Sequence, residues 1–90
     1  MLYAIVCRDK PNSLELRLAN REDHLAYAAS TGIVTLGGPM IDEDGGMCGS
    51  LLVVEADNLA AAQSWSDNDP YAKAGLFQSV EITAWKRAIG

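Results

Sequence analysis

The sequence contains few of the residues that hold small proteins together covalently or through metals. Among 90 residues it has two cysteines, Cys7 and Cys48, and one histidine, His24. Two cysteines are too few for a disulfide scaffold, so we expect free thiols and a reducing, cytoplasmic setting. One histidine and two separated cysteines do not make a zinc site, and the sequence therefore predicts no bound metal.

Basic residues are also scarce, since seven lysines and arginines stand against twelve acidic residues, for a net charge of −5. Such a surface argues against nucleic acid and anionic membranes as partners. No apolar run approaches the roughly 18 residues that a membrane span needs, and residues 1–7 lack the basic region of a secretory signal. Phosphate-binding glycine loops and dinucleotide fingerprints are absent as well, so we expect no cofactor.

What remains is the composition of an ordinary soluble globular protein, 49% hydrophobic and 21% charged. We expect one domain over residues 1–90, because chains usually divide only beyond roughly 250 residues. A domain of this size has a thin core. Apolar surface buried in a dimer would therefore stabilise it.

Hydrophobic periodicity predicts strands that alternate with helices. The strands are expected at 2–8, 33–41, 50–55 and 77–85, and the helical segments at 13–31, 58–67 and 70–75. Residues 42–46, with two glycines, form the polar tip of a hairpin. The order β-α-β-β-α-β predicts a ferredoxin-like α+β fold with a four-stranded antiparallel sheet.

The first and third predicted strands are apolar on both faces, most clearly in the run Leu51–Val54. Helices cover only one face of the sheet in a ferredoxin-like fold, so the other apolar face would contact water in a monomer. We therefore expect a homodimer or a higher homo-oligomer that packs sheet against sheet.

The segment 13–31 admits two readings. Leu14, Leu18 and Leu25 recur at helical spacing, which fits one continuous helix ended by Gly32. Asn20 could instead cap a fresh helix, with Asp23 three residues further on. Both are allowed, and we favour the break at Asn20.

His24 and Asp69 are the candidate catalytic pair. If Asn20 caps a helix, His24 lies in its first turn, where the helix dipole disfavours the imidazolium and keeps the ring neutral, as a general base requires. Asp69, which precedes Pro70, could orient the imidazole through a hydrogen bond. The alternatives are an ordinary histidine at the surface or core edge and a plain helix cap.

Four further residues are candidates for binding a substrate. On a continuous helix Arg21 falls inside the leucine stripe with Arg17 on its flank, and a buried arginine needs a carboxylate or a ligand anion. A break at Asn20 would instead let Arg21 reach solvent. Pro39, after Gly38, marks a bulge or an edge where a ligand can approach, or merely a bent edge strand. Ser50 begins the third strand and would need an adjacent base to act as a nucleophile.

Spaced motifs along nearly the whole chain resemble the YciI-like, YCII-related family. They include Arg21-x-x-His24-Leu25, Gly38-Pro39-Met40, Gly49-Ser50 and Asp69-Pro70-Tyr71. The resemblance implies a ferredoxin-like, dimeric α/β-barrel assembly whose pocket holds a histidine–aspartate pair. On the matching motifs these would be His24 and Asp69, with Arg17, Arg21, Pro39 and Ser50 in the pocket. The segment after Met40 is shorter than in familiar members, so the identity of the substrate does not transfer.

Two functions are compatible with these residues. The first is a cofactor-independent lyase or isomerase, similar to dehydrochlorinases or muconolactone isomerases. In it His24 moves a proton on a small organic acid, Asp69 orients His24, and an arginine holds the substrate carboxylate. The second is a non-catalytic binding or accessory module in which the same pocket recognises a small anion. We favour the first.

Overall fold

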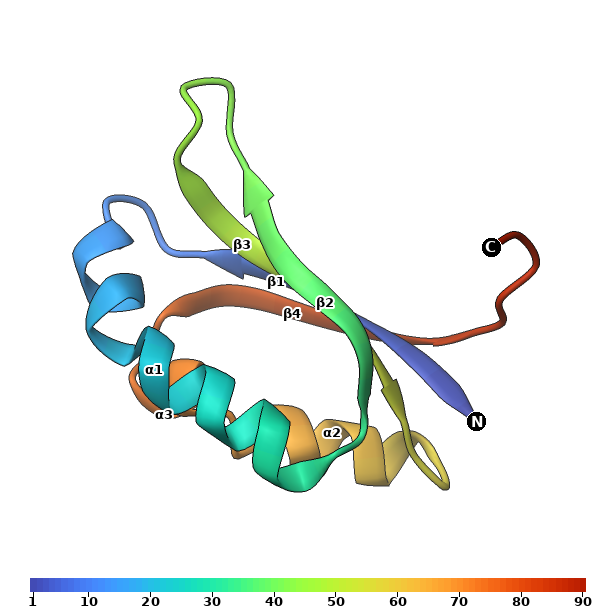
Figure 1. Cartoon of the computed structure of the whole chain (residues 1–90). Helices are drawn as coiled ribbons and strands as arrows, with labels where there is room; N and C mark the ends of the chain where they lie inside the picture. Colours follow the sequence, from blue (N-terminus) through green and yellow to red (C-terminus); the bar gives the residue numbers. More distant parts are fainter.

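The computed structural model describes residues 1–90 and has four strands and three helices (Figure 1). In chain order these are β1 (Leu2–Asp9), α1 (Leu14–Thr31), β2 (Val34–Ile41), β3 (Met47–Glu55), α2 (Leu59–Asp67), α3 (Pro70–Lys73) and β4 (Phe77–Trp85). The α+β order is the predicted one. Gly32 ends α1 in the left-handed conformation, with φ of 68°, where a side chain would be strained.

The strands form one antiparallel sheet in the order β2-β3-β1-β4, and the helices all lie on one face of it (Figure 1). This arrangement is the ferredoxin-like fold. The two strands that are apolar on both faces, β1 and β3, occupy the centre of the sheet. None of the helices is both long and apolar enough to span a bilayer.

The core fills the space between the sheet and the helices. Its buried members alternate along the central strands and meet the inner face of α2, and they are Tyr3, Ile5, Cys7, Leu52, Val54, Ala62 and Trp65. Trp65 also ties α2 to α1, since its indole nitrogen donates to Thr31 Oγ1 at 2.9 Å. Tyr27 Oη donates to the carbonyl of Trp65 at 2.7 Å. These contacts fix α1 over the sheet.

The expected break at Asn20 is wrong, because α1 is one continuous helix of 18 residues. Asn20 lies inside the helix, and its side-chain amide donates to the carbonyl of Leu16 at 2.9 Å. His24 therefore lies in the middle of the helix and not in a first turn. The helix dipole argument for a neutral imidazole does not apply.

The face of α1 that meets the sheet was also predicted wrongly. Leu14, Leu18 and Leu25 are 44, 52 and 49% exposed, whereas Arg17 and His24 are the buried residues of the helix. Polar side chains can face the interior here because each finds a buried carboxylate from another segment. Periodicity within one helix contains no information about such partners.

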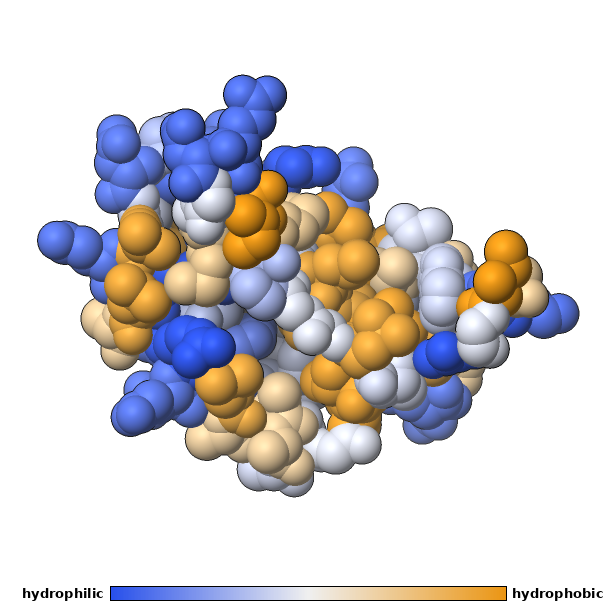
Figure 2. All heavy atoms as spheres, turned by 45° about the horizontal axis from the view of Figure 1, so that its top comes forward, coloured by the Kyte–Doolittle hydropathy of each residue, from blue (hydrophilic) through white to orange (hydrophobic).

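The other face of the sheet carries no helix (Figure 1). Leu36, Leu51 and Trp85 lie on it and remain 41, 41 and 37% exposed. In the view of Figure 2, apolar side chains gather through the middle of the visible surface, with hydrophilic ones mostly around them. An apolar sheet face of this kind is left open in the single chain.

Candidate active site

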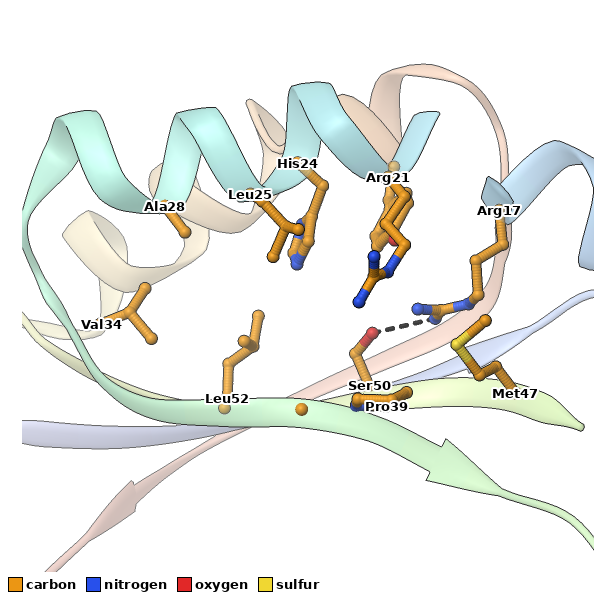
Figure 3. Close-up of a pocket in the computed structure, with 13 residues that line it drawn as sticks. Arg17, Arg21, His24, Leu25, Ala28, Val34, Pro39, Met47, Ser50 and Leu52 are labelled. Atoms are coloured by element: carbon orange, nitrogen blue, oxygen red, sulfur yellow. Dashed lines mark hydrogen bonds between the residues drawn. The ribbon is translucent and has the colours of Figure 1, made fainter. Parts of the chain in front are cut away.

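A cavity of about 130 Å³ lies between α1 and the sheet, over the edge strand β2 and its neighbour β3 (Figure 3). Five of the six predicted site residues line it, namely Arg17, Arg21, His24, Pro39 and Ser50. The sixth, Asp69, lies behind His24. A volume of this order suits one six-membered ring, since a cavity of about 150 Å³ holds benzene.

Glycine in β2 leaves room for the cavity. Gly37 and Gly38 are both part of its lining and contribute only backbone. A methyl group added at Gly37 would overlap the end of the Leu52 side chain, so alanine there would force Leu52 to move. Pro39 follows at the same edge strand, where its missing N–H group is tolerated.

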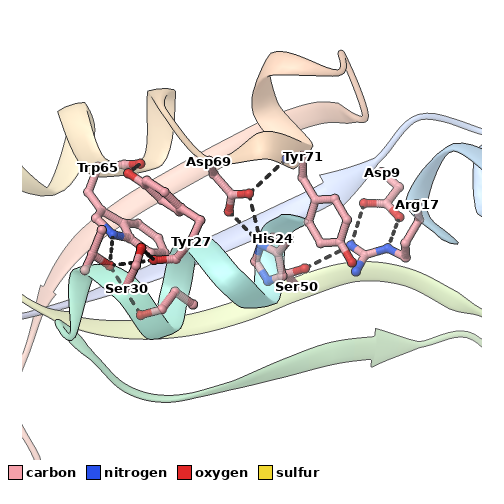
Figure 4. Close-up of polar contacts among 11 residues, drawn as sticks. Asp9, Arg17, His24, Tyr27, Ser30, Ser50, Trp65, Asp69 and Tyr71 are labelled. Carbon is pink, nitrogen blue, oxygen red and sulfur yellow. Dashed lines mark hydrogen bonds and ion pairs between the residues drawn. The ribbon is translucent and has the colours of Figure 1, made fainter. Parts of the chain in front are cut away.

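His24 and Asp69 are in contact. The ring nitrogen Nδ1 lies 2.9 Å from Asp69 Oδ1 and 3.0 Å from Asp69 Oδ2 (Figure 4). Both side chains are buried, with 7 and 1% of each residue exposed. A carboxylate can only accept, so Nδ1 carries the hydrogen of the neutral ring and Nε2 keeps a lone pair. The ring points from α1 toward the cavity (Figure 3).

The local sequence around Asp69 explains how its carboxylate is held. Pro70 begins α3, and Asp69 caps it by accepting the backbone N–H of Tyr71 at 2.9 Å. The same oxygen, Oδ1, contacts His24. The helix cap and the orientation of the imidazole are therefore two functions of one side chain.

Tyr71 lies between His24 and Arg17 (Figure 4). Its ring stacks on the imidazole, with centroids 4.1 Å apart and an interplanar angle of 15°. The Arg17 guanidinium carbon lies 4.6 Å from the ring centroid. Burial raises the pKa of Tyr71, and the positive charges of Arg17 and Arg21 partly oppose this. Tyr71 stays a neutral phenol that fixes the position of both neighbours.

Arg17 is paired inside the protein. Its Nε and Nη2 donate to the two carboxylate oxygens of Asp9 at 2.7 and 2.9 Å, and Nη2 also donates to Ser50 Oγ at 2.9 Å. Burial acts to lower the pKa of Arg17, but the hydrogen bond and the charge of Asp9 outweigh it and the pKa is raised. The pair is therefore ionic and close to neutral overall.

Arg21 differs from Arg17 because it makes no ion pair and is exposed at the mouth of the cavity. A buried arginine would need a carboxylate or a ligand anion as its partner. Arg21 needs neither, because it lies on the stripe of α1 that faces solvent. Arg21 supplies the positive charge of the lining that no internal carboxylate neutralises. An anionic ligand would be attracted by it.

Cys7 lies under this region on β1 and is 1% exposed. Burial, and to a lesser degree the charge of Asp69, raises its pKa to about 12. A thiol with this pKa stays protonated and is a poor nucleophile. Cys48 is also a free thiol.

Sequence reasoning did not identify two residues of the site. Asp9 was treated as a loop residue, although an acid at the end of a strand and an arginine one turn into the next helix are natural partners. For Tyr71 the sequence offers one signal, its place in the motif Asp69-Pro70-Tyr71, and this motif does not indicate that the ring stacks on the imidazole.

The fold and the site define a class of small ferredoxin-like proteins with a buried histidine–carboxylate contact beside a ring-sized cavity. The model of the YCII-related domain matches residues 1–86. The chain belongs to this family. Protein YciI of Escherichia coli O6:H1 and an uncharacterized protein of Haemophilus influenzae are each 38% identical to it over 96 residues, covering 97% of this chain and 98% of each relative.

Solved structures show the same fold. The 5-chloro-2-hydroxyhydroquinone dehydrochlorinase TftG of Burkholderia phenoliruptrix, in complex with 2,5-dihydroxybenzoquinone, is 36% identical, with a TM-score of 0.88 over 98% of this chain and 96% of that one. Rv0793 of Mycobacterium tuberculosis is 11% identical, with a TM-score of 0.65 over the full length of both chains. At that identity the likeness concerns the fold alone.

Proposed function

We propose that this protein is a cofactor-independent lyase or isomerase that moves a proton on a small, ring-derived organic acid. The observation that carries the proposal is the contact between His24 Nδ1 and the buried carboxylate of Asp69, which leaves Nε2 free beside the cavity. A positioned imidazole with a lone pair toward a substrate is a general base.

The proposed step begins when Nε2 of His24 takes a proton from a carbon next to a carbonyl group. The electron pair of the broken C–H bond forms a C=C bond to the carbonyl carbon, and the carbonyl π pair moves onto oxygen to give an enolate. In a lyase the enolate forms its carbonyl group again and expels a leaving group such as chloride, with its bonding pair, from the next carbon. In an isomerase the enolate forms its carbonyl group again and takes the proton back from Nε2 at another carbon. Asp69 stabilises the imidazolium that forms and holds the ring in place. Arg21 attracts the substrate carboxylate at the mouth of the cavity.

The size of the cavity and the relationship to TftG support a ring-derived substrate. TftG acts on a chlorinated hydroxyhydroquinone and binds 2,5-dihydroxybenzoquinone, which are both single six-membered rings. The cavity of about 130 Å³ suits a molecule of that size. Pro39 and Ser50 would lie against the ring from the sheet.

We also propose that two copies pack their open sheet faces together, as a dimer or as part of a higher oligomer. The apolar residues Leu36, Leu51 and Trp85 would then leave water. Two free thiols, one of them fully buried, fit the cytoplasm as the compartment.

Turnover tests the proposal. Release of chloride from 5-chloro-2-hydroxyhydroquinone, a phenolic ring without a carboxylate, and consumption of small unsaturated or halogenated carboxylic acids should be measured for three proteins. These are the wild type, His24→Ala and a control, Asp23→Asn, which changes an exposed residue of the same helix. We expect turnover by the wild type and the control only. Binding of 2,5-dihydroxybenzoquinone without turnover of any compound would favour a non-catalytic binding module instead.

A further inference from the structure

We infer that Ser50 donates the hydrogen bond to the substrate oxygen that becomes negative, and that Asp9 is the positioning residue that, through Arg17, directs this donor. The inference rests on the proposed function and names its substrate class. That class is a ring with an enolisable carbonyl group or a phenol-type oxygen, conjugated to the carbon that loses the proton.

The contacts of Arg17 determine what the Ser50 hydroxyl can do. A hydroxyl has one donor and two acceptor sites, and Ser50 Oγ accepts from Arg17 Nη2 at 2.9 Å. Arginine has no acceptor, so Ser50 cannot return its hydrogen to Arg17. No other group of the protein accepts a hydrogen bond from the Ser50 hydroxyl, and Ser50 lines the cavity. Its hydrogen is therefore available to a bound ligand.

Asp9 makes this arrangement rigid. It accepts two hydrogen bonds from Arg17, and the side chains of Asp9 and Arg17 are only 5 and 3% exposed. The bidentate contact fixes the plane of the guanidinium, and hence the direction of the N–H group that reaches Ser50. Because Asp9 neutralises Arg17, the cavity presents a polarised hydroxyl at this place and not a net charge.

The position of Ser50 relative to His24 matches the electron flow of the proposed step. Figure 3 shows His24 reaching from α1 and Ser50 reaching from β3 into the same cavity. When Nε2 takes the proton, the C–H electron pair forms a C=C bond and the carbonyl π pair moves onto oxygen. A donor fixed in advance at that oxygen favours the enolate over the ground state.

Binding of 4-nitrophenol tests the inference without any turnover, because its absorption spectrum distinguishes phenolate from phenol. We expect the wild type to prefer the phenolate, and Ser50→Ala to reduce this preference about tenfold, the effect of one hydrogen bond to a charged group. Ser79→Ala, on an exposed residue of β4, is the matched control and should behave as the wild type.

Variants of Asp9 separate positioning from mere support of the fold. Asp9→Asn should reduce the phenolate preference as Ser50→Ala does, and Asp9→Glu should restore part of it. If a substrate is found, Ser50→Ala should lower kcat by roughly 100-fold with KM nearly unchanged. Circular dichroism checks that each variant is folded. If Asp9→Asn is unfolded, the result for Ser50→Ala alone decides whether the inference holds.

An unchanged phenolate preference in folded Ser50→Ala would overturn the inference, and so would a wild type that binds neither form or prefers the neutral phenol. Failure of the proposed function looks different. In that case no compound is turned over, while the phenolate preference and its loss in Ser50→Ala remain.

Discussion

Replacing Asp69 by asparagine tests the proposed role of the histidine with little change in shape. The amide side chain would keep one oxygen for the Tyr71 N–H group that Asp69 now caps at 2.9 Å. Its NH2 group would take the place of Oδ2, which now lies 3.0 Å from His24 Nδ1. The oxygen that is kept also lies 2.9 Å from Nδ1, but without its charge it accepts only weakly. The NH2 group beside it donates, so it favours the tautomer in which Nδ1 accepts and Nε2 carries the hydrogen. Nε2 would then lack the lone pair that a base needs.

The size of the effect follows from these contacts. General base catalysis contributes about 10²- to 10⁴-fold to a rate, and Asp69→Asn should remove most of it from kcat. Asparagine is as good a helix cap as aspartate, so the cap of α3 should survive. The lost charged hydrogen bond at this buried site should cost about 1–3 kcal/mol of the free energy of unfolding.

Two measurements separate catalysis from stability, namely steady-state turnover at a temperature well below the unfolding transition, and urea unfolding of the same samples. The control is Asp67→Asn, because Asp67 is an exposed acid at the end of α2. A folded Asp69→Asn protein with kcat within about threefold of the wild type would refute the argument that Asp69 prepares the base.

Three further predictions follow from other parts of the structure. Arg21→Gln should raise KM for an anionic substrate about tenfold and change kcat little, because Arg21 offers charge at the mouth of the cavity and not at the reacting atoms. Initial rates at several salt concentrations check this prediction, and an unchanged KM contradicts it. Leu51→Asp places a charge on the open sheet face and should leave a monomer in light scattering, whereas an unmodified chain that is already monomeric would exclude the proposed sheet-to-sheet packing. Burial raises the pKa of Cys7 from 9.0 to about 12, so the thiol of the unfolded chain loses its proton at lower pH than the thiol of the folded protein. The free energy of unfolding should therefore fall as pH rises from about 9 toward 12, by at most about 1.4 kcal/mol per pH unit. Urea unfolding between about pH 8 and 10.5 should show a shallower fall for Cys7→Ala, and an identical slope would contradict the assigned cause.

Much of the fold could be predicted from the sequence. Strand β4 was expected at its observed bounds, and Gly32 ends α1 where its freedom to adopt positive φ suggested. These features depend on local patterns, such as alternation along a strand or a glycine after a helical run. Local patterns are what a single sequence displays directly.

The packing of α1 shows where such patterns fail. Leu14 and Leu18 suggested the buried face, but that face belongs to Arg17 and His24. Their carboxylate partners, Asp9 and Asp69, are eight and 45 residues away along the chain. Only the tertiary fold decides that burying two polar groups with partners is more favourable than burying leucines.

The candidate site was located mainly through the family motifs and less through physical inference. The motifs pointed to His24 and Asp69, and the structure brings these two side chains together. Neither motifs nor periodicity indicated that Asp9 neutralises Arg17 or that Tyr71 stacks on the imidazole. Those contacts join three separate segments. They leave Arg17 paired inside the protein and Arg21 without an ion pair at the cavity.

The most direct test of the central claim is the tautomer of the one histidine in the chain. In protein labelled with ¹⁵N-histidine, a long-range proton–nitrogen NMR spectrum will contain the signals of a single imidazole, that of His24. The account predicts that the neutral ring carries its hydrogen on Nδ1, toward Asp69, and has an unprotonated Nε2 toward the cavity. A neutral ring with its hydrogen on Nε2 would contradict the account, because such a ring could not accept the substrate proton.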